Sequence, residues 1–161
     1  MRSAALSLVA VAMALAALPA QSQDHPKRKP GLWEIKAVSG AGPQPMVMQQ
    51  CTDDAFEAQM LKEGTEQAKT MCSKNDMRRE GDKILSDSVC KVGTSTVTSQ
   101  SVTTGVFTRA YRVEVKSTIS PPMAGQQGSA TVMEARWLGP CLPGQKPGAM
   151  IMPGMPTPKE K

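Results

Sequence analysis

Four cysteines constrain the fold of this chain more than any other feature of its sequence. They are Cys51, Cys72, Cys90 and Cys141, with 20, 17 and 50 residues between successive members. A zinc site or a thioredoxin-like redox pair would require close pairs such as C-x-x-C, which this spacing does not provide. The even number favours two structural disulfides, provided that the chain reaches an oxidising compartment.

The N-terminus indicates export to such a compartment. Arg2 supplies a positive charge, a mostly apolar run extends from Ala4 to Leu18, and Pro19 ends it. Ala20-Gln21-Ser22 then fits the small-x-small pattern of a signal-peptide cleavage site. The run is about 15 residues long, short of the roughly 20 that a membrane-spanning helix needs. We expect a signal peptide over residues 1–22, cleavage near Ala20 to Ser22, no membrane span, and a periplasmic or secreted mature protein.

The rest of the chain divides into three parts. Residues 23–29 are polar and basic, which predicts a flexible arm, and His25, the single histidine of the chain, is expected there as a solvated residue without a role. Residues 30–141 are expected to form a single disulfide-linked β domain. Six prolines and four glycines fall within residues 139–161, so we expect a disordered tail rich in Pro, Gly and Met over residues 142–161.

Alternation of apolar and polar side chains predicts the β domain. In residues 31–38 the pattern directs Trp33, Ile35 and Ala37 to one face. The longest such run, residues 106–119, has one apolar face, which includes Phe107, Tyr111 and Val113, and one solvated face, which is typical of antiparallel sheets. Residues 129–138 alternate in the same way and direct Met133, Ala135 and Trp137 inward. The fold class predicted is mainly β, with a single curled antiparallel sheet or half-barrel of about six or seven strands and one short helix packed on it.

The helix is expected directly after Cys51. Thr52 can cap its N-terminus, and Asp53-Asp54 would lie favourably in its first turn, against the helix dipole. Gly64 is expected to end or interrupt it. We interpret the helix face around Phe56 as packing that fills the inner face of the sheet.

A hairpin argument predicts the disulfide pairing. If Glu80-Gly81-Asp82 forms a three-residue loop, the antiparallel ladder places Cys72 directly opposite Cys90, within disulfide distance. A two-residue loop would move the two cysteines to opposite faces. Cys51 and Cys141 then pair by elimination and close a loop of about 90 residues.

The layout of these segments resembles a known family. Pro30-Gly31-Leu32-Trp33-Glu34 opens the domain, a stretch containing Pro and Met leads to Cys51-Thr52, Cys72 and Cys90 follow, and Gly139-Pro140-Cys141 closes it. This combination resembles the bacterial family known as domain of unknown function 3617 over nearly the whole domain. The resemblance implies an exported protein of this architecture, and the family carries no established activity.

Enzyme chemistry has little support in the sequence. Nucleophilic hydrolysis needs a general base near a serine or cysteine, and the single histidine, His25, belongs to the arm. No G-x-S-x-G, P-loop or G-x-G-x-x-G motif is present. The formal charge of +5 is scattered among acidic residues, which argues against a nucleic-acid groove. We therefore expect no enzyme, no catalytic residue, no cofactor and no nucleic-acid partner.

Three functions without catalysis remain. The first is a binding or interaction module of the cell envelope, with an envelope partner that the sequence does not identify. The second is a carrier of a small apolar ligand or lipid in a β half-barrel. The third is Cu(I) binding by the thioethers of Met150, Met152 and Met155, with Met46 and Met48 as a further pair, because soft sulfur ligands select Cu(I). Low-complexity Met-Pro-Gly sequence is the competing interpretation of the tail.

Overall fold

The computed structural model describes residues 25–39 and 45–152. The predicted signal peptide and Met155 lie outside this part of the chain. The elements within it are β1 (Gly31–Ser39), β2 (Met46–Thr52), α1 (Asp54–Met71), β3 (Cys72–Glu80), β4 (Lys83–Val92), β5 (Ser95–Val106), β6 (Ala110–Met123), β7 (Gln126–Gly139) and β8 (Met150–Ile151). All eight of these strands form one antiparallel sheet in the order β3-β4-β5-β6-β7-β1-β2-β8.

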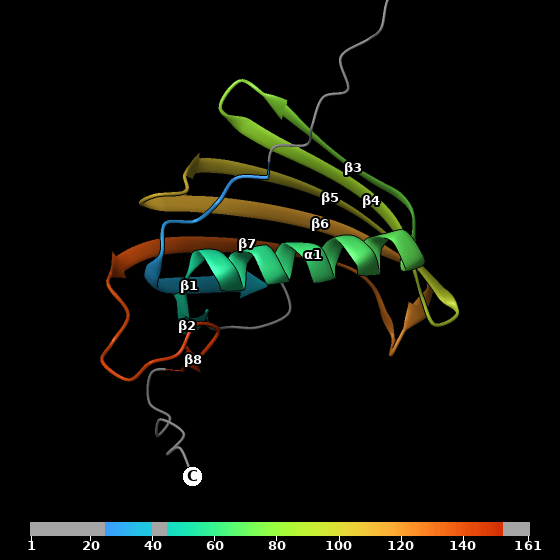
Figure 1. Cartoon of the computed structure of the whole chain (residues 1–161). Helices are drawn as coiled ribbons and strands as arrows, with labels where there is room; N and C mark the ends of the chain where they lie inside the picture. The colour runs from blue at the N-terminus through green and yellow to red at the C-terminus, as the bar shows by residue number, and fades with distance from the viewer. Residues whose placement is uncertain (1–24, 40–44, 153–161) are drawn as a thin grey trace, which may run out of the picture.

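The sheet is curved, and α1 lies across one of its faces (Figure 1). The prediction of a mainly β fold with a single curled antiparallel sheet and one helix is confirmed. Eight strands rather than six or seven are present in the described residues, because the segment after Cys141 contributes β8.

The two faces of the sheet differ in the way that the alternation predicts. The inner face, toward α1, holds the buried cluster of Trp33, Ile35 and Ala135. The outer face carries charged side chains that pair across neighbouring strands, as Arg136 does with Glu34 at 2.8 Å. This is the arrangement of an antiparallel sheet with one packed and one solvated face.

The helix begins and ends differently from the prediction. Asp53, not Thr52, is the N-cap, and its carboxylate accepts a hydrogen bond of 2.7 Å from the backbone N–H of Phe56. Thr52 is still part of β2 and is buried, so its hydroxyl donates instead to the carboxylate of Glu57. Gly64 does not stop α1, which continues through it for a total of 18 residues. The cost of a helical glycine, about 1 kcal/mol, is evidently offset by the turns on either side.

The hairpin of β3 and β4 has an unexpected register. The predicted three-residue loop at residues 80–82 is wrong, because β3 and β4 pair up to a two-residue turn in which Gly81 has a φ of 61°. A positive φ at that position is what a tight hairpin turn requires. A register shift at Ser73, a β-bulge, then restores the pairing of Cys72 with Cys90. The pairing is therefore as predicted, although the loop from which it was derived is not.

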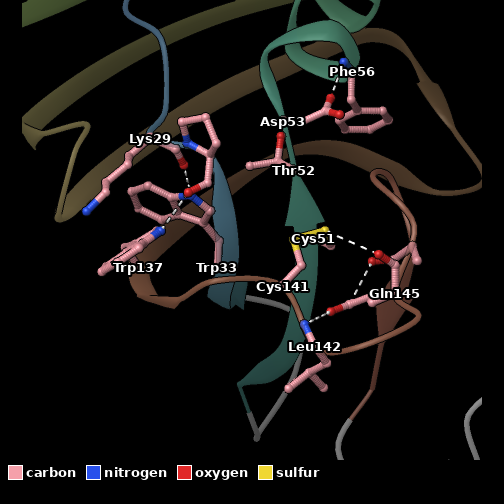
Figure 2. Close-up of a disulfide and its surroundings, with 12 residues drawn as sticks. Lys29, Trp33, Cys51, Thr52, Asp53, Phe56, Trp137, Cys141, Leu142 and Gln145 are labelled. Carbon is pink, nitrogen blue, oxygen red and sulfur yellow. Dashed lines mark hydrogen bonds between the residues drawn. A yellow bond between two sulfur atoms is a disulfide. The ribbon is translucent and has the colours of Figure 1, made fainter.

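The second disulfide joins Cys51 to Cys141, with Cα atoms 5.4 Å apart, and this pairing also agrees with the prediction (Figure 2). Beyond it the chain turns back, with the backbone N–H of Gln145 donating to Leu142 at 2.9 Å. Gly148 donates to the carbonyl of Cys51 at 2.8 Å, and β8 pairs with β2.

Residues 142–152 are therefore ordered, and the expectation of disorder from residue 142 onward is wrong for them. The reason is tertiary, because the disulfide holds the segment beside the edge of β2, whose unpaired backbone groups it satisfies.

The arm expected to be flexible is also packed, as far as it is described. The backbone N–H of Lys29 donates to the carbonyl of Phe107 at 3.0 Å, and the indole of Trp33 donates to the carbonyl of Lys29 at 2.8 Å. Phe107 itself lies in the turn between β5 and β6, so the long strand expected over residues 106–119 is interrupted at its start. The arm runs from this turn into β1 along the side of the sheet that faces α1.

Candidate functional site

The space between α1 and the inner face of the sheet is not filled. None of the residues of α1 is buried. A cavity of about 400 Å³, here called the inner hollow, lies between the helix, the arm and β3 to β6. This volume is within the range of small-molecule sites. Its lining is His25, Pro26, Lys27, Glu57, Ala58, Met60, Leu61, Met77, Ile84, Ser86, Thr103, Phe107, Tyr111 and Val113.

Short side chains in the middle of the sheet explain why room remains. Thr103 of β5 lies opposite Ile84 on one side and Val113 on the other. Ser86 of β4 lies opposite Met77 of β3. Residues 94–104 are rich in Ser, Thr and Val, which favour β-structure, and this run places Thr103 at an inward position, while Ser86 is a second small residue in β4. These small side chains leave empty space at the positions where larger side chains would have contacted the helix.

The helix presents exposed apolar side chains to this hollow. Met60 and Leu61 are 50% and 40% exposed. Phe56, which we expected to fill the inner face, instead lies near Gly148 of the returning tail. A Cβ built on Gly148 would come within 2.8 Å of the ring of Phe56. The interpretation of Phe56 as the filler of the inner face is therefore wrong, because the tail supplies its packing partner.

Aromatic rings connect the inner hollow with the buried core. The ring of Tyr111 stacks on Phe107 with centroids 4.7 Å apart, and it lies 5.6 Å from the ring of Trp33. Trp33 is fully buried. This part of the lining is therefore rigid, since it is continuous with the cluster that holds β1, β6 and β7 together.

A partly buried ion pair ties the arm to the helix beside the hollow. The Nε of Arg28 donates to Glu57 at 3.0 Å, and its Nη2 donates to Gln50 at 3.2 Å. Burial lowers the pKa of the Arg28 guanidinium, but the hydrogen bond to Glu57 and the nearby Tyr111 outweigh it and raise the pKa overall. Arg28 thus stays charged and balances the one carboxylate in the lining.

Tyr111 is held in its neutral form. Burial raises the pKa of its hydroxyl, and the positive charge of Arg28 opposes this rise only in part. The other polar side chains at the margin of the hollow, His25 and Lys27, are exposed, and Lys27 carries a positive charge. His25 therefore lies at the hollow, where the sequence indicated a solvated residue without a role.

The residues singled out from the sequence lie elsewhere. Neither disulfide contributes to the lining of the inner hollow. Met150 pairs with Gln50 of β2, and Met152 follows β8 in the chain. Within residues 25–39 and 45–152, no group of three or more His, Cys, Asp or Glu is placed to hold a metal ion. The alternation pattern did indicate Tyr111 and Val113 as inward-facing, but the hollow itself had no signal in the sequence beyond the small residues of β4 and β5.

A second depression, of about 490 Å³, lies on the outer face. Four of its five charged residues pair within the sheet, Arg112 with Glu134 and Arg136 with Glu34, and the fifth is Lys36. Gly105 leaves the depression open, because it carries no side chain between β5 and β6. A ligand there would have to compete with existing ion pairs, so the inner hollow is the better candidate.

The fold and the inner hollow together define the class of protein. It consists of a single antiparallel sheet with two disulfides, and one helix lies over the inner face of the sheet without filling it. No helix in the described part of the chain is long and apolar enough to cross a membrane. The family model described as Protein of unknown function (DUF3617) matches residues 28–141. The chain belongs to this family, which confirms the resemblance seen in its sequence. No curated protein and no solved structure matches the chain.

Proposed function

We propose that this chain is a non-enzymatic binding protein of the cell envelope, and that the inner hollow holds a small apolar or amphipathic ligand. One observation carries the proposal. A cavity of about 400 Å³ separates α1 from the sheet, and the apolar side chains of Met60 and Leu61 stay exposed beside it. Apolar surface kept out of a protein's own core is typical of a binding site.

The charges around the hollow favour an acidic head group on the ligand. Its apolar lining, including Met77, Ile84 and Val113, suits a hydrocarbon body. His25 and Lys27 stand at the margin, and Arg28 already neutralises the carboxylate of Glu57. An amphiphile with a carboxylate would therefore meet basic groups and no unpaired acid in this lining. A long-chain fatty acid has this chemistry.

Binding of a fluorescent long-chain fatty acid tests the proposal. Ala58 lines the hollow from α1, and Ala55 is an exposed position of the same helix outside the lining. The wild-type chain should bind the probe saturably. Ala58→Trp should weaken binding at least about tenfold by filling the hollow, while Ala55→Trp should leave it unchanged.

A neutral probe separates the two parts of the proposal. The methyl ester of the same acid should bind more weakly, because it offers no negative charge to Lys27. Equal binding of acid and ester would overturn the preference for an acidic head group. Absence of saturable wild-type binding, or equal losses in the two tryptophan variants, would overturn the hollow as the site.

We also propose that the chain is exported, with residues 1–22 removed as a signal peptide and the mature protein located in the periplasm or secreted. The two disulfides support this, because such bonds persist in oxidising compartments. The intact mass of protein from the periplasmic fraction should correspond to a chain that begins near Gln21 or Gln23. A mass that retains Met1 would contradict export by cleavage.

A further inference from the structure

Two Met-x-Met segments that are about a hundred residues apart in the sequence become neighbours in the structure. Met46 and Met48 belong to β2, and Met150 begins β8. The ladder between β2 and β8 pairs Gln50 with Met150 and Gln49 with Ile151. Met152 is the residue after the end of β8, and continuing this register by one step would place it opposite Met48.

The alternation of the strands places all four methionines on the same side of the sheet. Met48 lies opposite Ile35 and packs against the buried cluster of the inner face. Met46 is two residues before it in β2, and side chains two apart in a strand share a face. Met150 lies opposite Gln50, which itself lies opposite Trp33 of the inner face. Met152 follows Met150 by two residues.

These positions bring the thioether of Met48 within reach of Met46, Met150 and Met152, whereas Met46 and Met150 lie at opposite ends of the group, about 13 Å apart along the strand direction. Directly opposed residues of an antiparallel pair have Cβ atoms about 5 Å apart, and diagonal neighbours are about 7–8 Å apart. A methionine side chain spans such distances because it is long and unbranched. Met48 stands at the centre, with Met46 beside it along β2 and Met152 across the ladder.

Exposure separates this group from ordinary core packing. Met46 and Met150 are each 55% exposed and Met152 is 39% exposed. Methionines that fill gaps in a core are buried, and these three are not. They form an accessible group of soft ligands around the partly buried Met48, at the edge of the sheet and outside the inner hollow.

We propose that Met48 and Met152, together with either Met46 or Met150, form a thioether site for Cu(I). Soft sulfur ligands select Cu(I) over harder cations. All four cysteines are engaged in disulfides, so methionine is the source of soft sulfur in the described chain. Thioethers carry no proton to release, so affinity should not change with pH across the range in which histidine titrates. The site is independent of the inner hollow, and it exists only while the tail is paired with β2.

Anaerobic titration of the full chain with Cu(I), against a chromogenic Cu(I) chelator, tests the site. The wild-type chain should bind one Cu(I) with the same affinity between about pH 5 and pH 8. Met48→Leu and Met152→Leu should each weaken binding at least about tenfold, while keeping the volume of the side chain. Met60→Leu is the matched control, because Met60 is 50% exposed but lies on α1. The affinity of Met60→Leu for Cu(I) should equal that of the wild type.

Three results would overturn the proposal. The first is wild-type affinity no tighter than that of free methionine. The second is equal weakening by Met60→Leu and Met48→Leu. The third is loss of binding on Met155→Leu alone, with Met48→Leu and Met152→Leu unchanged, which would place the metal outside the paired strands. Far-UV circular dichroism and thermal unfolding of each variant establish that the sheet is intact. Ag(I), which undergoes no redox change under these conditions, serves as a second probe.

Discussion

Gly31 shows how the fold dictates one residue of the Pro-Gly-Leu-Trp-Glu opening. Its φ is 134°, and a Cβ at this position would collide with the carbonyl oxygen of Gly139 and with the indole nitrogen of Trp137. The close approach lets that indole donate to the carbonyl of Pro30 at 3.0 Å. A side chain at position 31 would thus force β1 and β7 apart where the arm enters the sheet.

Gly31→Ala should lower the free energy of unfolding by about 3 kcal/mol, because it combines a strained φ with a backbone clash. Gly64→Ala is the control, since nothing lies within 4 Å of a Cβ there and the position is helical. That change should raise the free energy of unfolding by about 0.5–1 kcal/mol. Urea unfolding of both variants measures the difference, and equal effects would contradict this account of Gly31.

Tyr111 is the single tyrosine of the chain, so absorbance of the phenolate reports on it alone. Burial raises its pKa above the ordinary value of about 10. The stability that depends on neutral Tyr111 is therefore present below about pH 10 and is lost as pH rises through the higher pKa of the folded state. The phenol of Tyr111 should titrate at a higher pH in the folded protein than in the denatured protein. Tyr111→Phe should remain folded at a higher pH than the wild type. A folded midpoint at or below the denatured one would contradict burial of the hydroxyl.

At the scale of elements, the two disulfides constrain different parts of the fold. Cys72–Cys90 closes the hairpin of β3 and β4, with a separation of 18 residues. Cys51–Cys141 links β2 to the end of β7 over 90 residues, and it also holds the returning tail. The entropy that a cross-link removes from the unfolded chain grows with the length of the loop it closes.

The longer bridge should therefore contribute more to stability. Replacing both Cys51 and Cys141 by alanine should lower the free energy of unfolding by roughly 4 kcal/mol, against roughly 3 kcal/mol for Cys72 and Cys90. Urea unfolding of the two double variants gives the comparison. The reverse order would show that the bulge at Ser73 depends on its bridge more strongly than loop length predicts.

The returning tail is a second element whose contribution can be isolated. A chain that ends at Gly144 keeps Cys141 but loses both backbone hydrogen bonds to Cys51, the contact of Gly148 with Phe56, and β8. We expect its free energy of unfolding to fall by about 2 kcal/mol. A chain that ends at Met152 retains these contacts and is the control. Identical thermal midpoints for the two truncations would contradict packing of the tail.

For the molecule as a whole, the inner hollow links stability to ligand binding. A ligand that binds only the folded state at a hundred times its Kd stabilises the protein by about 2.7 kcal/mol. The thermal midpoint of the wild type should therefore rise with added fatty acid. Ala58→Trp should be at least as stable as the wild type without ligand, because the indole fills the hollow, and fatty acid should not raise its midpoint further. A ligand-dependent rise in this variant would place binding elsewhere.

Much of the fold was predictable from local sequence. The period of two in β1 and β7 identified the inner face that buries Trp33 and Ala135, because each strand carries its own alternation. The acidic pair after Cys51 located the start of the helix to within one residue, although Asp53 rather than Thr52 caps it. The alternation of the strands and the start of the helix both depend on residues that are close together in the sequence.

The hollow was not predictable in this way. Phe107, Tyr111 and Val113 were expected on one face, but nothing local shows that a hollow remains between them and α1. That outcome depends on Phe56 turning to Gly148 of the tail, a contact between segments far apart in the sequence. The pairing of the two Met-x-Met segments has the same origin.

The sequence by itself determined a β protein with an apolar face and one helix after Cys51. Only the tertiary structure decided the bulge at Ser73, the return of residues 142–152 to β2, and the unfilled space beneath α1. The physical reason is that alternation and capping act over a few residues. The placement of the helix and the tail depends instead on which distant surfaces remain available once the sheet has formed.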